Sequence, residues 1–363
     1  MTFEEFVQHA EAFARDNDEP GTLSLRHLQR LVSGQPIGTP RPATARLLEH
    51  LFGEPITALL APPKTTVMTE TEEDSKAELR QLLDAARRVD QSTIELLHQQ
   101  LDAIRRLDRQ LGAIVVRDEL KAKTRQVERL AGHSLAPGTR EPLAALLSEM
   151  YTLAGWQALD LGDITESWRH YEKGRSAAAQ SGSIAYESHA AAEQAFVLID
   201  AGATRDAVDL LDNARRRADV SAPRILRAWL AAAHGEALAS YGDQTASLHA
   251  FDQATELLPD QSGSGERPYV ALDQVHLARW RGHALARFGH LNAITVLTNA
   301  LDHLDPTFVR AETALRVDLA TALATNGDRD NARRHANHAA ILATQVGSIR
   351  QRRRITALLS AVQ

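Results

Sequence analysis

The sequence contains no cysteine in its 363 residues. Disulfide bonds, thiolate metal sites and cysteine nucleophiles are therefore excluded. Long apolar runs are also missing, so no segment is predicted to cross a bilayer. The first residues, MTFEEFVQHAEAF, carry acids where a signal peptide has a basic start. We therefore expect a cytoplasmic protein that does not contact a membrane.

Aromatic residues make up only 5% of the chain, and runs of β-branched residues are nearly absent. Strands favour these residue types, whereas the alanine, leucine, arginine and glutamate that dominate here favour helices. An excess of basic residues is missing too, since the formal net charge is -6 and the pI is about 6.2. The sequence thus predicts an all-α fold. It also excludes a protein that coats nucleic acid by electrostatic attraction alone.

Motifs for catalysis and cofactor binding are missing as well. No phosphate-binding loop, dinucleotide fingerprint, nucleophile elbow or H-E-x-x-H metal motif occurs. His335 and His338 lie three residues apart and share a helical face, but no carboxylate near them completes a metal site, so a solvated helix face is favoured. We predict that the protein is not an enzyme and that it binds no cofactor and no metal.

A repeat is the main feature that the sequence does contain. Five glycines, spaced 38 to 47 residues apart, each follow one helical segment and precede another: Gly162, Gly202, Gly242, Gly289 and Gly327. Each is expected to end its helix in the left-handed conformation that glycine adopts at low cost. The period predicts five helical hairpins in series.

Small and bulky residues recur in phase with these glycines. A small residue lies seven positions before the glycine, another lies five after it, and a bulky residue usually lies four further on; the fourth copy has a turn one residue shorter. In chain order the positions hold Gly155, Ser167 and Tyr171; Ala195, Ala207 and Leu211; Gly235, Ser247 and Phe251; Gly282, Ala293 and Leu297; and Ala320, Ala332 and Ala336. This pattern resembles the tetratricopeptide repeat.

The resemblance covers residues 143–345 and implies an all-α, right-handed helical solenoid of five tetratricopeptide-like repeats. Small residues on the first helix of a repeat let the second helix approach, and the bulky residue fills the remaining space. The alternative is a set of alanine-rich helical hairpins in which the small residues have no such role.

In the tetratricopeptide family the first helix of each repeat lines a concave groove that binds a peptide or protein. The corresponding ligand-binding residues in this sequence are Trp156, Asp160, His189, Phe196, Trp229, Glu236, His276, Arg279, His283 and Arg287. Aromatic rings beside charges suit a peptide with apolar anchors and an acidic group near Arg279 and Arg287. For Trp156, Phe196 and Trp229, burial between repeats is the alternative.

Two further helical regions flank the repeats. Residues 64–142 are predicted to form a linker and a long helical pair, in which apolar residues recur at helical spacing: Ile94, Leu97, Leu101, Ile104 and Leu111. Packing onto the repeats is favoured over a coiled-coil seam between two copies of the chain, because the run is short. Residues 346–363 are predicted to form a basic capping helix, which neutralises the helix dipole or meets an acidic partner or nucleic acid.

Residues 1–63 are predicted to form a separate helical unit, with helices at Phe3 to Arg15, Leu25 to Val32, Ala43 to Phe52 and Pro55 to Leu60. The order of helices and glycine turns resembles the C-terminal part of a helix-turn-helix domain of the XRE type. Joined to the repeats, it is similar to actinobacterial XRE-type regulators that carry tetratricopeptide domains. The resemblance implies DNA contacts from one helix, at Arg26, His27, Gln29 and Arg30.

This unit departs from the helix-turn-helix pattern in two respects. Between Arg15 and Leu23 there are too few residues for the helix that normally precedes the recognition helix. Five arginines, no lysine and eight acids also give the unit a charge of 5 - 8 = -3. A degenerate helix-turn-helix unit kept for protein contact or dimerisation is therefore the competing interpretation.

Two functional hypotheses follow from these features. The first is a non-enzymatic cytoplasmic regulator that binds a peptide or protein in the repeat groove and controls transcription through its N-terminal unit. The second is a scaffold or adaptor that makes no contact with DNA. The missing helix and the acidic N-terminal unit favour the second hypothesis, and the combination of the two regions favours the first.

Overall fold

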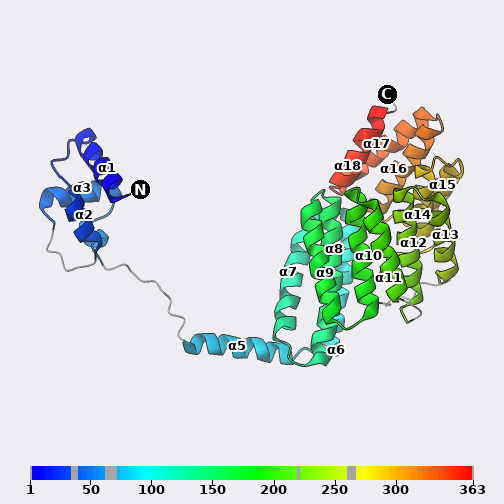
Figure 1. Cartoon of the computed structure of the whole chain (residues 1–363), viewed down its shortest axis with the longest axis horizontal. Coiled ribbons are helices and arrows are strands. Elements are labelled where there is room, and N and C mark those ends of the chain that lie inside the picture. Colours follow the sequence, from blue (N-terminus) through cyan, green and yellow to red (C-terminus); the bar gives the residue numbers. More distant parts are fainter. Residues whose placement is uncertain (1, 34–39, 62–71, 219–220, 260–266, 362–363) are drawn as a thin grey trace. The chain divides into compact units, whose positions relative to one another are not determined.

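The computed structural model describes residues 2–33, 40–61, 72–218, 221–259 and 267–361. Helices form all of the regular structure in these residues, which confirms the all-α prediction. The chain divides into two compact units, Met1–Ala77 and Glu78–Gln363, and the helix α5 (Glu72–Arg87) crosses the boundary between them (Figure 1). Among the described residues, no helix is long and apolar enough to span a bilayer.

The first unit contains four helices at the positions that the sequence predicts: α1 (Phe3–Asp16), α2 (Leu25–Val32), α3 (Pro42–Phe52) and α4 (Ile56–Leu59). They enclose a small core centred on Ala10, Leu23, Leu28 and Leu48. Thr2 starts α1 with a capping box to Glu5, and Pro42 starts α3 with a backbone angle already suited to a helix. The hydrophobic spacing therefore sets this unit's fold.

No helix lies between α1 and α2, where residues 19–24 are extended. The shortage of residues predicted from the sequence is thus a real difference from the helix-turn-helix order. Gly21 lies so close to α3 that a Cβ atom there would come within 2.3 Å of the Ala43 carbonyl oxygen. This segment, which has no regular secondary structure, packs directly against α3, where the Thr44 hydroxyl donates to the Thr22 carbonyl at 3.1 Å.

The second unit begins with a helical hairpin, α6 (Gln91–Leu111) and α7 (Ala113–His133). Asp90 caps α6, with its carboxylate accepting a hydrogen bond from the Thr93 amide at 2.8 Å. The apolar face of α6 is buried against α7 and α8. Ile94, Leu97, Leu101 and Ile104 thus pack within the chain, whereas Leu111 is exposed.

Five further hairpins and a last helix complete this unit. The first helices of the hairpins are α8 (Pro137–Asp160), α10 (Ile184–Asp200), α12 (Arg224–Tyr241), α14 (Gln274–Arg287) and α16 (Val309–Thr325). The second helices are α9 (Ile164–Gln180), α11 (Thr204–Ala218), α13 (Gln244–Leu257), α15 (Asn292–His303) and α17 (Arg329–Gln345), and α18 (Ile349–Ala361) ends the unit. α8 starts at Pro137, before the predicted beginning of the repeats at residue 143, and only residues 134–136 separate it from α7.

The five repeat glycines lie in the turns between paired helices, with φ between 67° and 98°. This conformation confirms the predicted role of these residues at the helix ends. Each first helix contacts its own second helix and the first helix of the next hairpin, so the unit is a helical solenoid (Figure 1).

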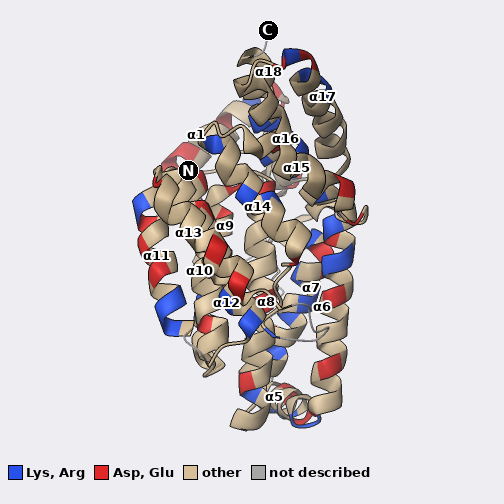
Figure 2. Cartoon of the chain, turned by 90° about the vertical axis from the view of Figure 1, so that its right-hand side faces the viewer, with Lys and Arg blue, Asp and Glu red and all other residues tan. Residues whose placement is uncertain are grey.

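The solenoid curls until its ends meet. α6 contacts α16, and α8 contacts α18, although many repeats separate these helices along the chain. The first helices therefore surround a common interior. Acidic and basic residues are interspersed along the helices seen in Figure 2. The hairpin of α6 and α7 and the final helix α18 are thus parts of the same enclosure as the five predicted repeats.

Paired helices meet at a seam of small and bulky residues. A Cβ atom on Gly155 or Gly235 would come within 2.9 Å of the ring of Tyr171 or Phe251, and one on Gly282 would come within 2.6 Å of a Leu297 methyl group. Only glycine allows these contacts without a shift of the helices. The small residues therefore have the packing role that the repeat pattern predicts.

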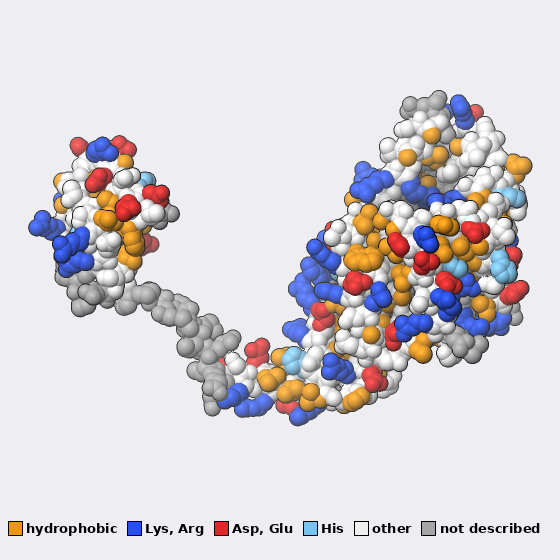
Figure 3. Space-filling model, viewed as in Figure 1, with side chains coloured by type: hydrophobic (Ala, Val, Ile, Leu, Met, Phe, Trp, Pro, Cys, Tyr) orange, Lys and Arg blue, Asp and Glu red, His pale blue; other side chains and the backbone are white. Residues whose placement is uncertain are grey.

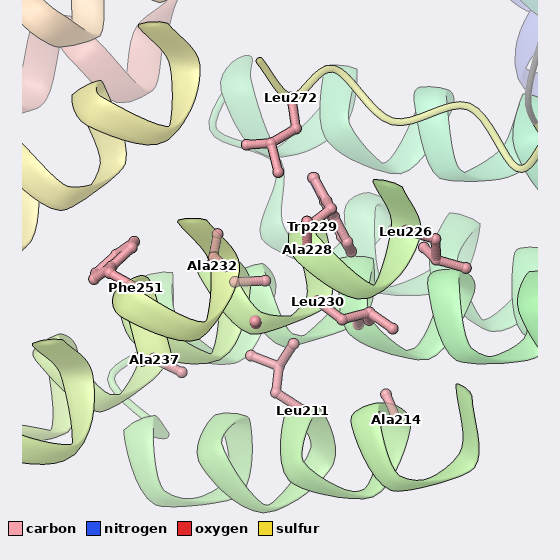
Figure 4. Packing of buried hydrophobic residues seen from close by; sticks show 14 of the residues in the cluster. Leu211, Ala214, Leu226, Ala228, Trp229, Leu230, Ala232, Ala237, Phe251 and Leu272 are labelled. Atoms are coloured by element: carbon pink, nitrogen blue, oxygen red, sulfur yellow. The ribbon is translucent and has the colours of Figure 1, made fainter. Parts of the chain in front are cut away.

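The first and third seams each contain the same kind of hydrogen bond, from a serine hydroxyl to the carbonyl of the glycine. The Ser167 hydroxyl donates to the Gly155 carbonyl at 2.7 Å, and the Ser247 hydroxyl donates to the Gly235 carbonyl at 2.8 Å. Figure 4 shows the third hairpin, in which Phe251 and Ala232 lie near one another and Leu211 comes from the preceding repeat. The seam thus repeats in its atoms as well as in its residue sizes.

Candidate functional site

The first helices surround a cavity of about 480 Å³. This volume lies within the usual range for pockets that bind small molecules. Its wall is built from α6, α8, α10, α12, α14, α16 and α18, together with residues 269–271 before α14. All ten residues predicted to bind a ligand lie in this wall: Trp156, Asp160, His189, Phe196, Trp229, Glu236, His276, Arg279, His283 and Arg287.

Aromatic rings from four successive first helices contact one another in the wall. The ring centroids of Trp156 and Phe196 are 6.4 Å apart, and Phe196 lies 6.2 Å from Trp229 and 5.9 Å from Trp280. Trp229 is 4% exposed, whereas the other three rings are partly exposed. The rings join neighbouring repeats and also line the cavity, with Trp229 mainly a core residue.

Several acidic side chains of the wall are engaged in ion pairs that close the solenoid. Arg310 of α16 lies between two carboxylates, 2.6 Å from Asp108 of α6 and 3.4 Å from Asp160 of α8. The Ser348 hydroxyl also donates to Asp160 at 2.6 Å. Asp160 is 2% exposed, and its Oδ1 accepts the hydrogen bond from Ser348, whereas its Oδ2 faces Arg310 without a hydrogen bond.

A second group of charges joins α12, α14, α16 and α18. His283 lies 2.7 Å from Glu236 and 3.8 Å from Asp318, and Arg354 lies 2.6 Å from Asp318. The nearby positive charges hold the pKa of Asp318 below its usual range in spite of its burial. Glu236 and His283, both predicted from the sequence, are therefore paired with each other across neighbouring repeats.

The opposite end of the cavity is held by a third group of ion pairs. Arg105 of α6 pairs with Asp102 and with the fully buried Glu149 of α8. Arg267, which lies before α14, pairs with Asp102 at 2.8 Å and with Glu149 at 3.4 Å. The Tyr186 hydroxyl donates to Glu149 at 3.2 Å, so this carboxylate has no vacant partner position.

Three arginines in the wall form no ion pair with any residue that the structure describes: Arg109, Arg279 and Arg287. The Nε atoms of Arg109 and Arg279 are buried without a hydrogen-bond acceptor. Arg109 packs its guanidinium over the Phe308 ring at 4.2 Å. Burial lowers the pKa of Arg279, an effect that nearby carboxylates only partly oppose. Arg109 and Arg279 are therefore partly buried cations without an ion-pair partner among the described residues, and Arg287 is an exposed one, although the wall as a whole contains equal numbers of arginines and carboxylates.

One carboxylic acid of the wall also has no cationic partner. Glu193 of α10 accepts a hydrogen bond from the Tyr171 hydroxyl at 3.3 Å, and its nearest basic group is His189, 3.7 Å away. Burial raises the pKa of Glu193 to about 7 and lowers the pKa of His189 to about 4. His189 is therefore neutral near pH 7 and leaves Glu193 without a compensating charge.

His276 lies at the start of α14 and is 5% exposed. Its Nδ1 lies 2.9 Å from the Asp273 carboxylate, and its ring packs edge-on against Phe308 at 4.6 Å. Among the described residues, no group of three or more potential ligands is placed to hold a metal ion. His335 and His338 lie on the second helix α17, away from the cavity wall.

The ten residues predicted from the sequence are about a third of the cavity wall, and the other two thirds were not predicted. The residues from α6, Arg105, Asp108 and Arg109, were assigned to a helical pair outside the repeats. Arg350 and Arg354 were assigned to a basic cap, but Arg350 pairs with Asp200 at 2.7 Å and Arg354 pairs with Asp318. The other two arginines of α18, Arg352 and Arg353, are exposed. The sequence signal that could have placed α6 in the cavity wall is that α6 and α7 are two consecutive helices joined at a glycine, Gly112, like the paired helices of the repeats.

The four residues predicted to contact DNA lie on α2 of the first unit. Arg26, Gln29 and Arg30 are exposed, and His27 is partly buried. Leu28, on the opposite face, enters the core. The helix thus presents its polar face outward, and no described residue forms an ion pair with Arg26 or Arg30.

The comparisons with known proteins add little to this geometry. No protein-family model and no curated protein matches the sequence. Among solved structures, a putative kinesin light chain from Podosopora anserina with nearly identical tetratricopeptide-like repeats shares 15% identity, with a TM-score of 0.36, over 55% of this chain and 95% of that one. The TPR2AB domain of yeast Sti1 in complex with pHSP90 shares 15% identity, with a TM-score of 0.27, over 60% of this chain and 98% of that one. Similarity at this level carries no argument about the ligand.

Proposed function

We propose that the chain is a non-enzymatic regulator whose cavity binds a short peptide segment of a partner protein. One observation carries the proposal: unpaired Arg109, Arg279 and Arg287 share a cavity with four aromatic rings. The rings would hold apolar side chains of the peptide, and the arginines would hold a carboxylate. Fixed arginines bind carboxylates well because several N–H groups can donate at once.

The ten residues predicted from the sequence contribute differently to this proposal. Arg279 and Arg287 would contact the acidic group, and Trp156 and Phe196 would contact the apolar side chains. Trp229, His189 and His276 support the wall from buried positions. Asp160, Glu236 and His283 would maintain the enclosure through their ion pairs. The ligand would therefore touch only part of the set.

A selection from a random heptapeptide library, followed by fluorescence titration, tests the proposal. Three of the four tryptophans line the cavity, so Trp168→Phe gives a protein whose tryptophan fluorescence reports on the cavity alone. We expect selected peptides to combine apolar and acidic residues, and Arg279→Ala to weaken their binding about 10- to 100-fold. Arg216→Ala is the matched control, because Arg216 pairs with Asp212 outside the cavity. Equal binding by both variants would contradict the proposal.

A second proposal concerns the first unit, which would carry the response to DNA. The exposed Arg26, Gln29 and Arg30 on α2 favour this role, since one helix face presents groups that contact phosphates and bases. The XRE-type resemblance points in the same direction. The alternative is an adaptor that uses the peptide cavity without any DNA contact.

Binding to fragments of the host genome distinguishes the two roles. A regulator is expected to retain specific fragments at about 150 mM salt, and Arg26→Ala with Arg30→Ala is expected to abolish that retention. Arg15→Ala with Arg46→Ala is the control, since these arginines lie on α1 and α3. An adaptor would retain no fragment above the background of unrelated DNA.

A further inference from the structure

The carboxylates of the cavity wall differ in one respect: all but one have a basic partner. Asp108 and Asp160 pair with Arg310, and Asp200, Glu236 and Asp318 each have an arginine or histidine within 2.7 Å. Glu149 pairs with Arg105 and Arg267. Glu193 alone relies on a tyrosine hydroxyl and a neutral histidine.

Glu193 is placed to meet a ligand. Its side chain is 19% exposed and lines the cavity. Phe196 lies on the next turn of the same helix, and the ring of Trp229 packs against His189 with centroids 5.2 Å apart. A carboxylate close to aromatic rings suits an ammonium or guanidinium group, because ring faces also attract cations. Such a group would give Glu193 the partner that it lacks.

The two unmatched kinds of charge lie apart within the cavity. No ion pair joins Glu193 to Arg109, Arg279 or Arg287, although all four line the same wall. Opposite charges left unpaired in a partly buried site are costly, and each gains from a partner of the opposite sign. A molecule that carries both signs, separated by an apolar body, would satisfy both positions.

We propose that Glu193 forms a cation-binding subsite and that the ligand is an amphoteric peptide, which presents a basic side chain to Glu193 and a carboxylate to the unpaired arginines. This inference rests on the proposed peptide-binding function and names the chemistry of its ligand. The apolar residues of the peptide would lie between the two charges, against Trp156, Phe196 and Trp280. Peptides with acidic and apolar residues alone would fill only part of the site.

The heptapeptide selection tests the subsite when it is repeated with Glu193→Gln and with Glu256→Gln as the control. Glu256 is exposed on α13 and does not line the cavity. Peptides selected by the unchanged protein and by the control are expected to be enriched in lysine or arginine, and those selected by Glu193→Gln are expected to lose this enrichment. Absence of the enrichment from the unchanged protein would overturn the subsite.

A thermodynamic cycle on one selected peptide gives a second measure. Replacing its basic residue by norleucine is expected to weaken binding about tenfold or more. Glu193→Gln is expected to weaken the original peptide to the same degree and to leave the norleucine peptide unaffected. Independent, additive losses would overturn the subsite.

The outcomes also separate this inference from the function on which it rests. If selected peptides depend on Arg279 but tolerate Glu193→Gln, the cavity binds acidic peptides and the cation subsite is wrong. If the unchanged protein selects no peptide, both the proposed function and the subsite are wrong.

Discussion

The seam between paired helices and the wall of the cavity lie on the same first helices but obey different rules. At the seam, the five small residues face partners that are all fully buried: Tyr171, Leu211, Phe251, Leu297 and Ala336. In the wall, the position six residues before the small residue changes in size and charge along the solenoid: it holds Glu149, His189, Trp229, His276 and Ala314. One face repeats, and the other face varies.

The seam residues hold the paired helices of the solenoid together, whereas the wall residues are the ones that could contact a ligand. The seam needs only a fit between the size of one residue and the space left by another, so glycine faces a ring or leucine, and alanine faces leucine or alanine. The wall has no such constraint, and its side chains form ion pairs and ring contacts that do not repeat. The patchwork of hydrophobic and charged side chains on the face of the solenoid seen in Figure 3 is similarly irregular.

Arg310→Met is expected to have the largest effect on stability, because it removes the ion pairs that join α16 to α6 and α8. Removal of the guanidinium leaves Asp108 and Asp160 buried without a cation, which costs about 4 kcal/mol of unfolding free energy. Urea unfolding followed by circular dichroism measures this loss. Arg316→Met is the control on the same helix, since Arg316 pairs with Glu312 one turn away, and it should cost about 1 kcal/mol. Equal losses would show that the Arg310 pairs do not hold the ends together.

Gly235→Arg is expected to cost about 3 kcal/mol, because it overfills the third seam. Even a Cβ atom at this position would lie 2.9–3.1 Å from the Phe251 ring. Gly132→Arg is the matched control: it lies in α7, and no atom lies within 4 Å of its added Cβ. The control should unfold at the same temperature as the unchanged protein or slightly higher, since arginine favours helices more than glycine does. A stable Gly235→Arg variant would contradict the assigned phase of the repeat.

The rules of the seam explain how much of the fold could be predicted from the sequence. Gly235 and Phe251 are sixteen residues apart in a fixed pattern, and the same pattern recurs around Gly155 and Tyr171. Local spacing therefore sufficed to predict the paired helices and the side of each first helix that faces inward. For the same reason, all ten residues assigned to that side lie in one cavity wall.

The contacts that close the solenoid could not be predicted in this way. Arg310 and Asp108 are 202 residues apart, and Arg350 and Asp200 are 150 apart, so each meeting depends on the curvature accumulated over several repeats. Spacing along one helix carries no information about that curvature. The sequence therefore predicts a basic capping helix at residues 346–363 but not the ion pairs of Arg350 and Arg354 with Asp200 and Asp318.

Glu193→Gln is expected to make stability less dependent on pH. The folded chain holds the pKa of Glu193 at about 7, against 4.5 for the ordinary side chain, so the unfolded chain releases this proton at lower pH. Stability is therefore lost as pH rises from about 4.5 to about 7, and this loss is about 3 kcal/mol. Glutamine does not titrate, so the variant should be as stable as the unchanged protein near pH 4 and more stable at pH 8.

Several charged or titratable groups face Glu193, and the comparison between the two proteins cancels their own titrations. They are Tyr171 from α9, His189 from α10, Arg105 from α6 and Glu149 from α8. Urea unfolding at pH 4, 6 and 8 measures the difference between the proteins at each pH. A difference that stays constant over this range would mean that Glu193 is ionised in the folded protein, and the wall would then contain a compensated charge.

The smallest expected effect comes from converting the third seam into a copy of the second. Gly235→Ala alone should cost about 1–2 kcal/mol, because the methyl group meets the Phe251 ring. In a Phe251→Leu background the pair becomes the alanine and leucine that occur at Ala195 and Leu211, so the same change should cost about 1 kcal/mol less. Urea unfolding of the four proteins gives this coupling energy. A coupling near zero would mean that each repeat adapts its helix spacing to its own residues, and the fit of sizes would then be local to each seam.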